Sequence, residues 1–324
     1  MIKLAFAGFR HGHIYSLYNS ALARNDIEIV GAWEADEAAR AEAEQKGVTF
    51  THSTLEDLLC NSGADAVAIG DCYGVRGQIA VAALKAGKHI ISDKPLCTRL
   101  SELEEIRALA NDKNLAVGIM LDLRDSENVA TAKAAIDEGL VGKINNICFE
   151  GQHPLNYGSR PGWYFEPDMH GGTINDIGIH GIDLVRFFTG SEPEKIVGAE
   201  TWNFYAKEVP HFSDSAQFLL RLASGARVMA DVSYAAPATQ GYSHSAYWHF
   251  RIWGDKGMIE FSANTQGVTA WLNGESEPRK LSPVPVKENY IDRFIRAIND
   301  PSVTEDTLDS AEQTLKIQAQ ADRA

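Results

Sequence analysis

The sequence predicts an α/β protein whose first domain is a doubly wound parallel sheet and whose second, α+β domain carries a large open, mainly antiparallel sheet. Short apolar runs alternate with helical patterns in the N-terminal part, as in parallel sheets with crossover helices. Beyond residue 122, strand-like segments follow one another across short turns. The 324 residues, 44% of them apolar, suffice for two cores. We therefore expect domains at residues 1–122 and 123–324.

Each expected element of the first domain follows from local patterns. Ser53-x-x-Glu56 and Ser101-x-x-Glu104 have the spacing of capping boxes, so helices are expected to begin there. Short apolar runs between these helical patterns predict the buried strands of a parallel sheet. The expected strands are 3–7, 28–33, 66–70, 89–92 and 116–120.

The second domain is expected to pair its strands mostly antiparallel. Ser224-Gly225 and the stretch 255–257 are short turn signals between consecutive strand-like segments. A helical tail is expected over 288–298 and again from Thr304 onward. The expected strands are 143–152, 195–205, 216–222, 226–234, 248–253 and 258–262.

Charge and composition exclude several classes of partner. The net charge of −14 opposes binding to nucleic acid and to anionic membranes. Met1 leads directly into a strand-like run and no apolar stretch approaches spanning length, so a cytoplasmic protein is expected. The four cysteines have no metal-like spacing and are expected to be reduced.

The stretch FAGFRHGHIY, residues 6–15, raises the question of a nucleotide site. A strand, a turn at Gly8 and a helix N-terminus offer backbone N–H groups to a diphosphate. Arg10 and His13 replace the second and third glycines of G-x-G-x-x-G, and Arg10 either turns outward or pairs with phosphate. Glu34, at the end of the second strand, suits ribose hydroxyls and opposes the extra phosphate of NADP. The alternative is that Gly8 is only a turn glycine and Glu34 an exposed strand-end acid.

Two further segments carry candidate chemistry. Lys94, in HIISDKPLCT, follows the fourth expected strand, where doubly wound sheets bind ligands, although it could be an ordinary loop lysine. Asp176, His180 and Asp183 follow spacings of four and three, which places them on one face of a regular helix. A carboxylate one turn from an imidazole orients it and raises its basicity. The alternative is a purely structural hydrogen bond.

These segments together resemble the glucose-fructose oxidoreductase and inositol dehydrogenase (Gfo/Idh/MocA) family. The most specific parts are AGKHIISDKPL and GGTINDIGIHGIDL, and the resemblance also covers the Gly8 turn, Glu34, Arg124, Trp163 and RIWGDKGMIEF. It implies an N-terminal Rossmann domain that binds NAD, with NADP less favoured. It also implies a C-terminal domain that binds substrate and forms a homodimer or homotetramer. Members mostly oxidise or reduce a carbinol or carbonyl of a sugar, cyclitol or related small molecule.

Carried onto this sequence, the resemblance assigns roles to three residues. Lys94 would contact the nicotinamide ribose and the substrate, His180 would be the acid/base, and Asp176 would be its partner or bind substrate. The substrate alcohol is expected to lie between Lys94 and His180. The expected cofactor-binding residues are Gly8, Phe9, Arg10, His11, Glu34, Asp71, Cys72, Arg76, Asp93 and Lys94.

Five positions depart from the family pattern. Asp93 replaces the usual glutamate before the lysine, the stretch Asp71-Cys72-Tyr73 replaces T-P-N, and Arg76 stands where histidine is frequent. The Asp71 carboxylate would repel a diphosphate unless Arg10 or Arg76 offsets its charge.

Substrate identity is weakly encoded. A polar and aromatic set suits a sugar ring and its hydroxyls, although Trp163 and Tyr164 are as readily explained as packing residues. The candidates are His153, Tyr157, Arg160, Trp163, Tyr164 and His170, together with Asp176 and His180.

Three other functions remain open from the sequence. One is an NAD-assisted lyase or hydrolase acting on a sugar derivative, and another is a non-catalytic protein that senses NAD or a sugar. A metal enzyme would draw on His11, His13, His170, His180 and Asp176. The spacing of His11 and His13 on a turn is a weak ligand signal, so no metal site is expected.

Overall fold

The computed structural model describes residues 1–300 and 306–323. The chain forms two compact units, each built from several stretches of sequence. Unit 1 comprises Met1–Met120, Pro161–Gly171 and Tyr290–Ala311, and unit 2 comprises Leu121–Arg160, Gly172–Asn289 and Glu312–Ala324. Thr304, where a helix was expected to begin, and residue 324 lie outside the described residues.

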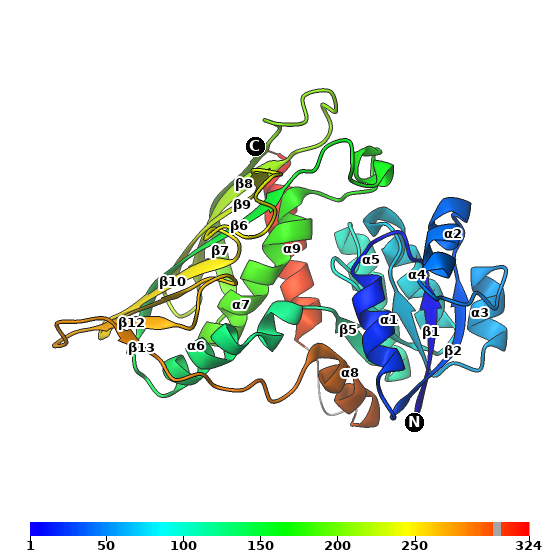
Figure 1. Cartoon of the computed structure of the whole chain (residues 1–324), viewed down its shortest axis with the longest axis horizontal. Coiled ribbons are helices and arrows are strands. Elements are labelled where there is room, and N and C mark those ends of the chain that lie inside the picture. Colours follow the sequence, from blue (N-terminus) through cyan, green and yellow to red (C-terminus); the bar gives the residue numbers. More distant parts are fainter. Residues whose placement is uncertain (301–305, 324) are drawn as a thin grey trace. The chain divides into compact units, whose positions relative to one another are not determined.

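Unit 1 contains a five-stranded parallel sheet with order β2-β1-β3-β4-β5. Figure 1 labels β1, β2 and β5 of this sheet. The order reverses between β1 and β3, so their carboxyl ends flank the crevice in which doubly wound sheets bind ligands. All five expected strands are confirmed. They are β1 (Ile2–Ala7), β2 (Ile27–Trp33), β3 (Ala66–Ile69), β4 (His89–Ser92) and β5 (Val117–Ile119).

Helices pack around this sheet, which explains why β3 is buried over its whole length. One apolar cluster joins β1, α1 and α8, and Phe294 of α8 lies over Gly118 of β5. The helices are α1 (Ile14–Leu22), α2 (Glu37–Gln45), α3 (Leu55–Asn61), α4 (Tyr73–Lys85), α5 (Leu100–Lys113) and α8 (Tyr290–Asn299).

Both expected capping boxes are wrong in detail. The N-cap of α3 is Thr54, whose side chain accepts a hydrogen bond from the backbone N–H of Asp57 at 3.1 Å. Ser53 and Thr54 are each followed by an acidic residue three positions later, and spacing alone does not separate them. Helix α5 begins directly after Arg99, so Ser101 lies inside its first turn.

Unit 2 contains an eight-stranded sheet with order β13-β12-β11-β10-β6-β9-β8-β7. All neighbours are antiparallel except β6 and β9, which confirms the expected mainly antiparallel sheet. Strands β12 and β13 were not expected from the sequence. The strands are β6 (Ile144–Pro154), β7 (Pro193–Trp202), β8 (Ser215–Leu222), β9 (Arg227–Ala236), β10 (His249–Gly254), β11 (Gly257–Phe261), β12 (Thr269–Leu272) and β13 (Arg279–Lys280).

Helices α6 (Glu127–Asp137) and α7 (Ile179–Thr189) lie on the same side of the large sheet (Figure 1). Helix α7 packs closely on β6. A Cβ atom at Gly181 would lie only 2.1 Å from the Phe149 ring, so glycine is needed at this contact. A π-helical turn, Ile174–Gly178, precedes α7, and α9 (Thr307–Ala321) ends the described chain. Among the described residues, no helix is both long and apolar enough to span a bilayer.

Candidate cofactor and substrate sites

The turn between β1 and α1 is fastened to the ends of two neighbouring strands. Gly8 has a φ of +84°, and a Cβ atom there would lie 2.6 Å from that of Asp71, so only glycine permits this close approach. The backbone N–H of His11 donates to the carbonyl of Gly70 at 3.0 Å. The turn leads directly into the N-terminus of α1, where the positive end of the helix dipole favours an anion. This geometry fits a diphosphate.

Glu34 is buried against this turn, with only 4% of its surface exposed. One carboxylate oxygen accepts a hydrogen bond from the backbone N–H of Phe9 at 2.5 Å, and the other accepts one from Asp36 at 2.8 Å. Burial raises the pKa of Glu34, whereas these two hydrogen bonds and nearby Arg10 oppose the rise. The alternative interpretation of Glu34 as an exposed acid is therefore wrong.

Arg10 pairs with Asp71, the carboxylate that was expected to disfavour a diphosphate. The Arg10 Nε atom contacts Asp71 Oδ1, and the same oxygen accepts the backbone N–H of Cys72 at 2.7 Å. Arg76 binds only the backbone carbonyl of Asp71, at 2.7 Å. The sequence left open whether Arg10 or Arg76 offsets the charge of the Asp71 carboxylate. In the structure, Arg10 forms this ion pair.

Arg76 is completely buried and holds the loop that follows β4. Its Nη1 donates to the carbonyls of Asp93 and Pro95 at 2.9 and 3.0 Å, and its Nη2 donates to the Asp93 carboxylate at 2.8 Å. Lys94, which is also buried, lies between these two anchored residues. Burial alone would raise the pKa of Asp93, but the charge of Arg76 and the neighbouring imidazoles hold it well below its usual 3.8.

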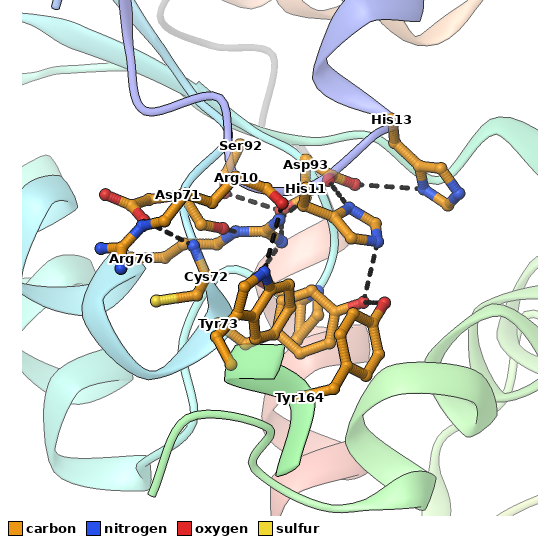
Figure 2. A network of polar contacts seen from close by, with 12 residues as sticks. Arg10, His11, His13, Asp71, Cys72, Tyr73, Arg76, Ser92, Asp93 and Tyr164 are labelled. Carbon is orange, nitrogen blue, oxygen red and sulfur yellow. Dashed lines mark hydrogen bonds and ion pairs between the residues drawn. The ribbon is translucent and has the colours of Figure 1, made fainter. Parts of the chain in front are cut away.

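A hydrogen-bonded chain runs from Asp93 through His11 to two tyrosines (Figure 2). Burial lowers the pKa of His11 to about 4, so the imidazole is neutral near pH 7. Because the ionised Asp93 only accepts, His11 Nδ1 carries the proton and donates to it. His11 Nε2 then accepts from the Tyr73 hydroxyl at 3.0 Å, and Tyr73 accepts from Tyr164 at 2.7 Å.

Trp163 and Tyr164 belong to unit 1, although the sequence placed them in the second domain. Both are buried and pack with Cys72 and Tyr73. The Trp163 indole donates to the backbone carbonyl of Arg10 at 3.2 Å, so it supports the turn directly. Their burial agrees with the packing interpretation, and a role in substrate binding stays a prediction.

In unit 2, the three polar residues around α7 have different partners. The Tyr234 hydroxyl donates to Asp176, and the His180 ring packs edge-on against Trp248 at a centroid distance of 5.2 Å. Asp183 binds the Arg124 guanidinium through both carboxylate oxygens, at 2.7 and 2.5 Å. The spacing predicted one face of a regular helix. The π-helical turn that contains Asp176 breaks this regularity.

Two further substrate candidates join the same cluster. The His153 ring lies 5.4 Å from that of Trp248, which it shares with His180. The Arg160 guanidinium lies 5.0 Å from the ring centre of Tyr234, the residue that binds Asp176. Sequence reasoning did not identify the two linking aromatic residues, because no motif marks them.

Two successive parts of the chain match models of known protein families. Residues 2–120 match the model of an oxidoreductase family with an NAD-binding Rossmann fold, and residues 129–260 match that of the GFO/IDH/MocA C-terminal domain. The chain is 27% identical to levoglucosan dehydrogenase of Pseudarthrobacter phenanthrenivorans over 71% of its own length and 63% of that protein. It is 28% identical to 1,5-anhydro-D-fructose reductase of Ensifer adhaerens, over 83% and 80%.

The fold also agrees with solved structures. An inositol dehydrogenase homolog from Azotobacter vinelandii, solved with NAD+, superposes with a TM-score of 0.83 at 19% identity. The superposition covers 100% of this chain and 96% of that chain. At 19% identity, this similarity shows that the two proteins share a fold.

Proposed function

Because this chain belongs to the Gfo/Idh/MocA family of oxidoreductases, we propose that it is an NAD-dependent dehydrogenase of a sugar, cyclitol or related small polyol. The reaction is transfer of a hydride between the nicotinamide cofactor and a secondary alcohol or its carbonyl. Two curated relatives, named as a levoglucosan dehydrogenase and a 1,5-anhydro-D-fructose reductase, support this substrate class.

The observation that carries the proposal is the fastened Gly8 turn beside a buried Glu34. Residues 1–122 would bind the dinucleotide. Each Glu34 oxygen accepts one backbone N–H and retains a lone pair for a ribose hydroxyl, while its charge opposes the additional phosphate of NADP. Arg10 removes the repulsion that Asp71 would exert on a diphosphate.

Residues 123–324 would bind the substrate, and His180 would exchange a proton with the substrate hydroxyl. NAD, when bound, exchanges the hydride. His180 takes the proton of the substrate hydroxyl during oxidation and returns it during reduction. Lys94 polarises the reacting oxygen, and Arg76 keeps the Lys94 backbone in place. Asp176, held by Tyr234, orients His180 or a substrate hydroxyl, and His153 and Arg160 provide further hydrogen bonds.

The proposal extends to the setting of the protein. We expect a cytoplasmic homodimer or homotetramer that binds neither nucleic acid nor membranes, in keeping with its net charge of −14.

The first experiment is calorimetric titration of the nucleotide-stripped protein with NAD and then with NADP. We expect NAD to bind at micromolar strength and NADP much more weakly. Absence of binding by both would contradict the proposal and favour a sensor without a nucleotide.

The second experiment measures NADH and products with a panel of polyols. A dehydrogenase forms one NADH for each substrate oxidised, whereas an NAD-assisted lyase or hydrolase releases a leaving group without net NADH. His180→Ala and Lys94→Ala should lose turnover while still binding NAD, and His211→Ala, which removes an exposed imidazole, should not. Near-native turnover of both site variants would refute the assigned roles.

A further inference from the structure

The Gly8 turn and the loop after β4 bring together three groups that are typical metal ligands. His11 and His13 lie on the turn, and Asp93 follows β4 (Figure 2). A ring nitrogen of each histidine and a carboxylate oxygen of Asp93 all lie within 4.8 Å of one another. We propose that these three residues bind one divalent transition-metal ion, with zinc as its representative.

The Asp93 carboxylate provides the strongest indication. Its side chain is fully buried, and its Oδ1 has no hydrogen-bond partner among the residues that the structure describes. This oxygen faces the cluster, 3.4 Å from His13 Nδ1. An ionised oxygen that is buried without a hydrogen bond is costly, and a bound cation is one of the few groups that satisfies it.

The surroundings of the cluster match those of ligands in metal sites. Ligating carboxylates usually accept a hydrogen bond at their second oxygen, and ligating imidazoles bind a partner through their second nitrogen. Asp93 Oδ2 accepts from Arg76 at 2.8 Å, and His11 Nε2 lies 3.0 Å from the Tyr73 hydroxyl. The Arg76 contact is therefore already formed, and the Tyr73 hydroxyl lies at hydrogen-bond distance from His11 Nε2.

Metal binding at His11 Nδ1 also requires a proton to leave that atom. The proton carried by Nδ1 in the metal-free state would be replaced by the ion, and the neutral ring would carry its proton on Nε2. Nε2 would then donate to Tyr73, and Tyr73 would donate to Tyr164, which reverses both hydrogen bonds without moving a heavy atom far. The hydroxyl chain can accommodate either state.

The ligand set also selects the metal. Two imidazole nitrogens and one carboxylate oxygen suit zinc, iron, cobalt or nickel, whereas magnesium and calcium prefer oxygen ligands only. Three protein ligands leave at least one coordination position open for water or an anionic oxygen. The His13 side chain is 51% exposed, so an ion can reach the cluster from solvent.

The test uses the full-length protein after treatment with a chelator, with no nucleotide present. Zn²⁺ is titrated calorimetrically, Co²⁺ is followed by its visible absorption, and Mg²⁺ is the negative control. We expect one Zn²⁺ per chain and no heat from Mg²⁺. Absence of stoichiometric Zn²⁺ binding would overturn the proposal and leave a metal-free hydrogen-bond chain. Because NAD plays no part in this assay, the outcome is independent of the proposed function.

Variants identify the ligands. His13→Ala should weaken Zn²⁺ binding at least about tenfold and alter the Co²⁺ spectrum, because ligand loss costs no less than loss of a supporting contact. Because the His13 side chain is half-exposed, its removal should leave the fold intact, and circular dichroism checks this. Tyr73→Phe should weaken binding by roughly 10–100-fold. His211→Ala removes an exposed imidazole elsewhere and should bind as the parent does. Unchanged affinity in His13→Ala, or in Tyr73→Phe, would contradict the site as assigned.

Discussion

The carboxylate of Glu34 accepts a hydrogen bond from the backbone N–H of Phe9 at 2.5 Å, across 25 positions of sequence. The residue that we propose selects the cofactor therefore also holds the turn that would receive the diphosphate. Selectivity and turn geometry should change together when this side chain is removed.

Glu34→Ala should lower the affinity for NAD, reduce the preference of NAD over NADP, and destabilise the fold. The buried N–H group of Phe9 loses its acceptor, which typically costs about 1–3 kcal/mol, and the N–H group of Asp36 loses its acceptor as well. Calorimetric titration measures the first two effects and urea unfolding the third. Glu28→Ala, at an exposed position of β2, the strand that Glu34 follows, is the matched control. If both variants keep the parent's ratio of NAD to NADP affinity, Glu34 does not select the cofactor.

A pH dependence of stability follows from His11. Burial lowers its pKa from 6.5 to about 4. Between these two values, His11 binds a proton in the unfolded chain but not in the folded chain. The stabilisation present above pH 6.5 should therefore decline as pH falls towards 4. At about 1.4 kcal/mol for each pKa unit, the decline is on the order of 3 kcal/mol.

His11→Gln should remove this part of the pH dependence. Its side-chain amide can still donate to Asp93, but it does not titrate. Urea unfolding of both proteins at pH 7, 5.5 and 4.5 measures the slope, and His211→Gln controls for loss of an exposed imidazole. An equal decline in parent and His11→Gln protein would show that His11 is not responsible.

The sequence predicted the parallel sheet well because the signals are local. A buried strand such as β3 reads as an unbroken apolar run, and a turn signal marks each end. Strands β12 and β13 were missed. Strand β13 has only two residues and lies at the edge of the sheet, and β12 pairs next to it. Helix starts were misplaced where two adjacent residues offered equivalent caps, as at Ser53 and Thr54.

The candidate sites were predictable only in part. Lys94 and Asp93 could be identified as site candidates, because they follow β4 and ligands bind at the carboxyl ends of strands in such sheets. The contact between Asp93 and His11 could not be predicted, because the two residues lie 82 positions apart and meet only through the order of the strands. For the same reason, spacing revealed only two of the three proposed metal ligands. The packing of the segment Pro161–Gly171 with unit 1 likewise depends on long-range contacts.

Arg76→Met should strongly destabilise the protein. The substitution preserves the volume of the side chain but removes the charge beside a carboxylate that is completely buried. Breaking one partner of a buried ion pair typically costs about 3–5 kcal/mol, because the other charge stays uncompensated. Urea unfolding at pH 7 measures the loss.

Arg99→Met provides the contrast on the protein surface. Arg99 and Glu102 form a partly exposed pair at 3.4 Å, for which about 0–1 kcal/mol is expected. Comparable losses for Arg76→Met and Arg99→Met would contradict the assignment of Arg76 as the residue that anchors the Lys94 loop.

Tyr234→Phe should impair turnover more than folding. The Tyr234 hydroxyl donates to Asp176, and a hydrogen bond to a charged group is worth about 1.5–3 kcal/mol. If Asp176 must be held in place during the proton transfer at His180, this loss should appear as a roughly 10–100-fold lower kcat with a smaller change in KM. The pH profile of kcat should also shift, because the imidazole then has a less ordered neighbour. Tyr205→Phe, at an exposed tyrosine, is the matched control and should keep both constants. A parent-like kcat for Tyr234→Phe would mean that the orientation of Asp176 does not limit the reaction, and would leave Asp176 as a substrate-binding residue at most.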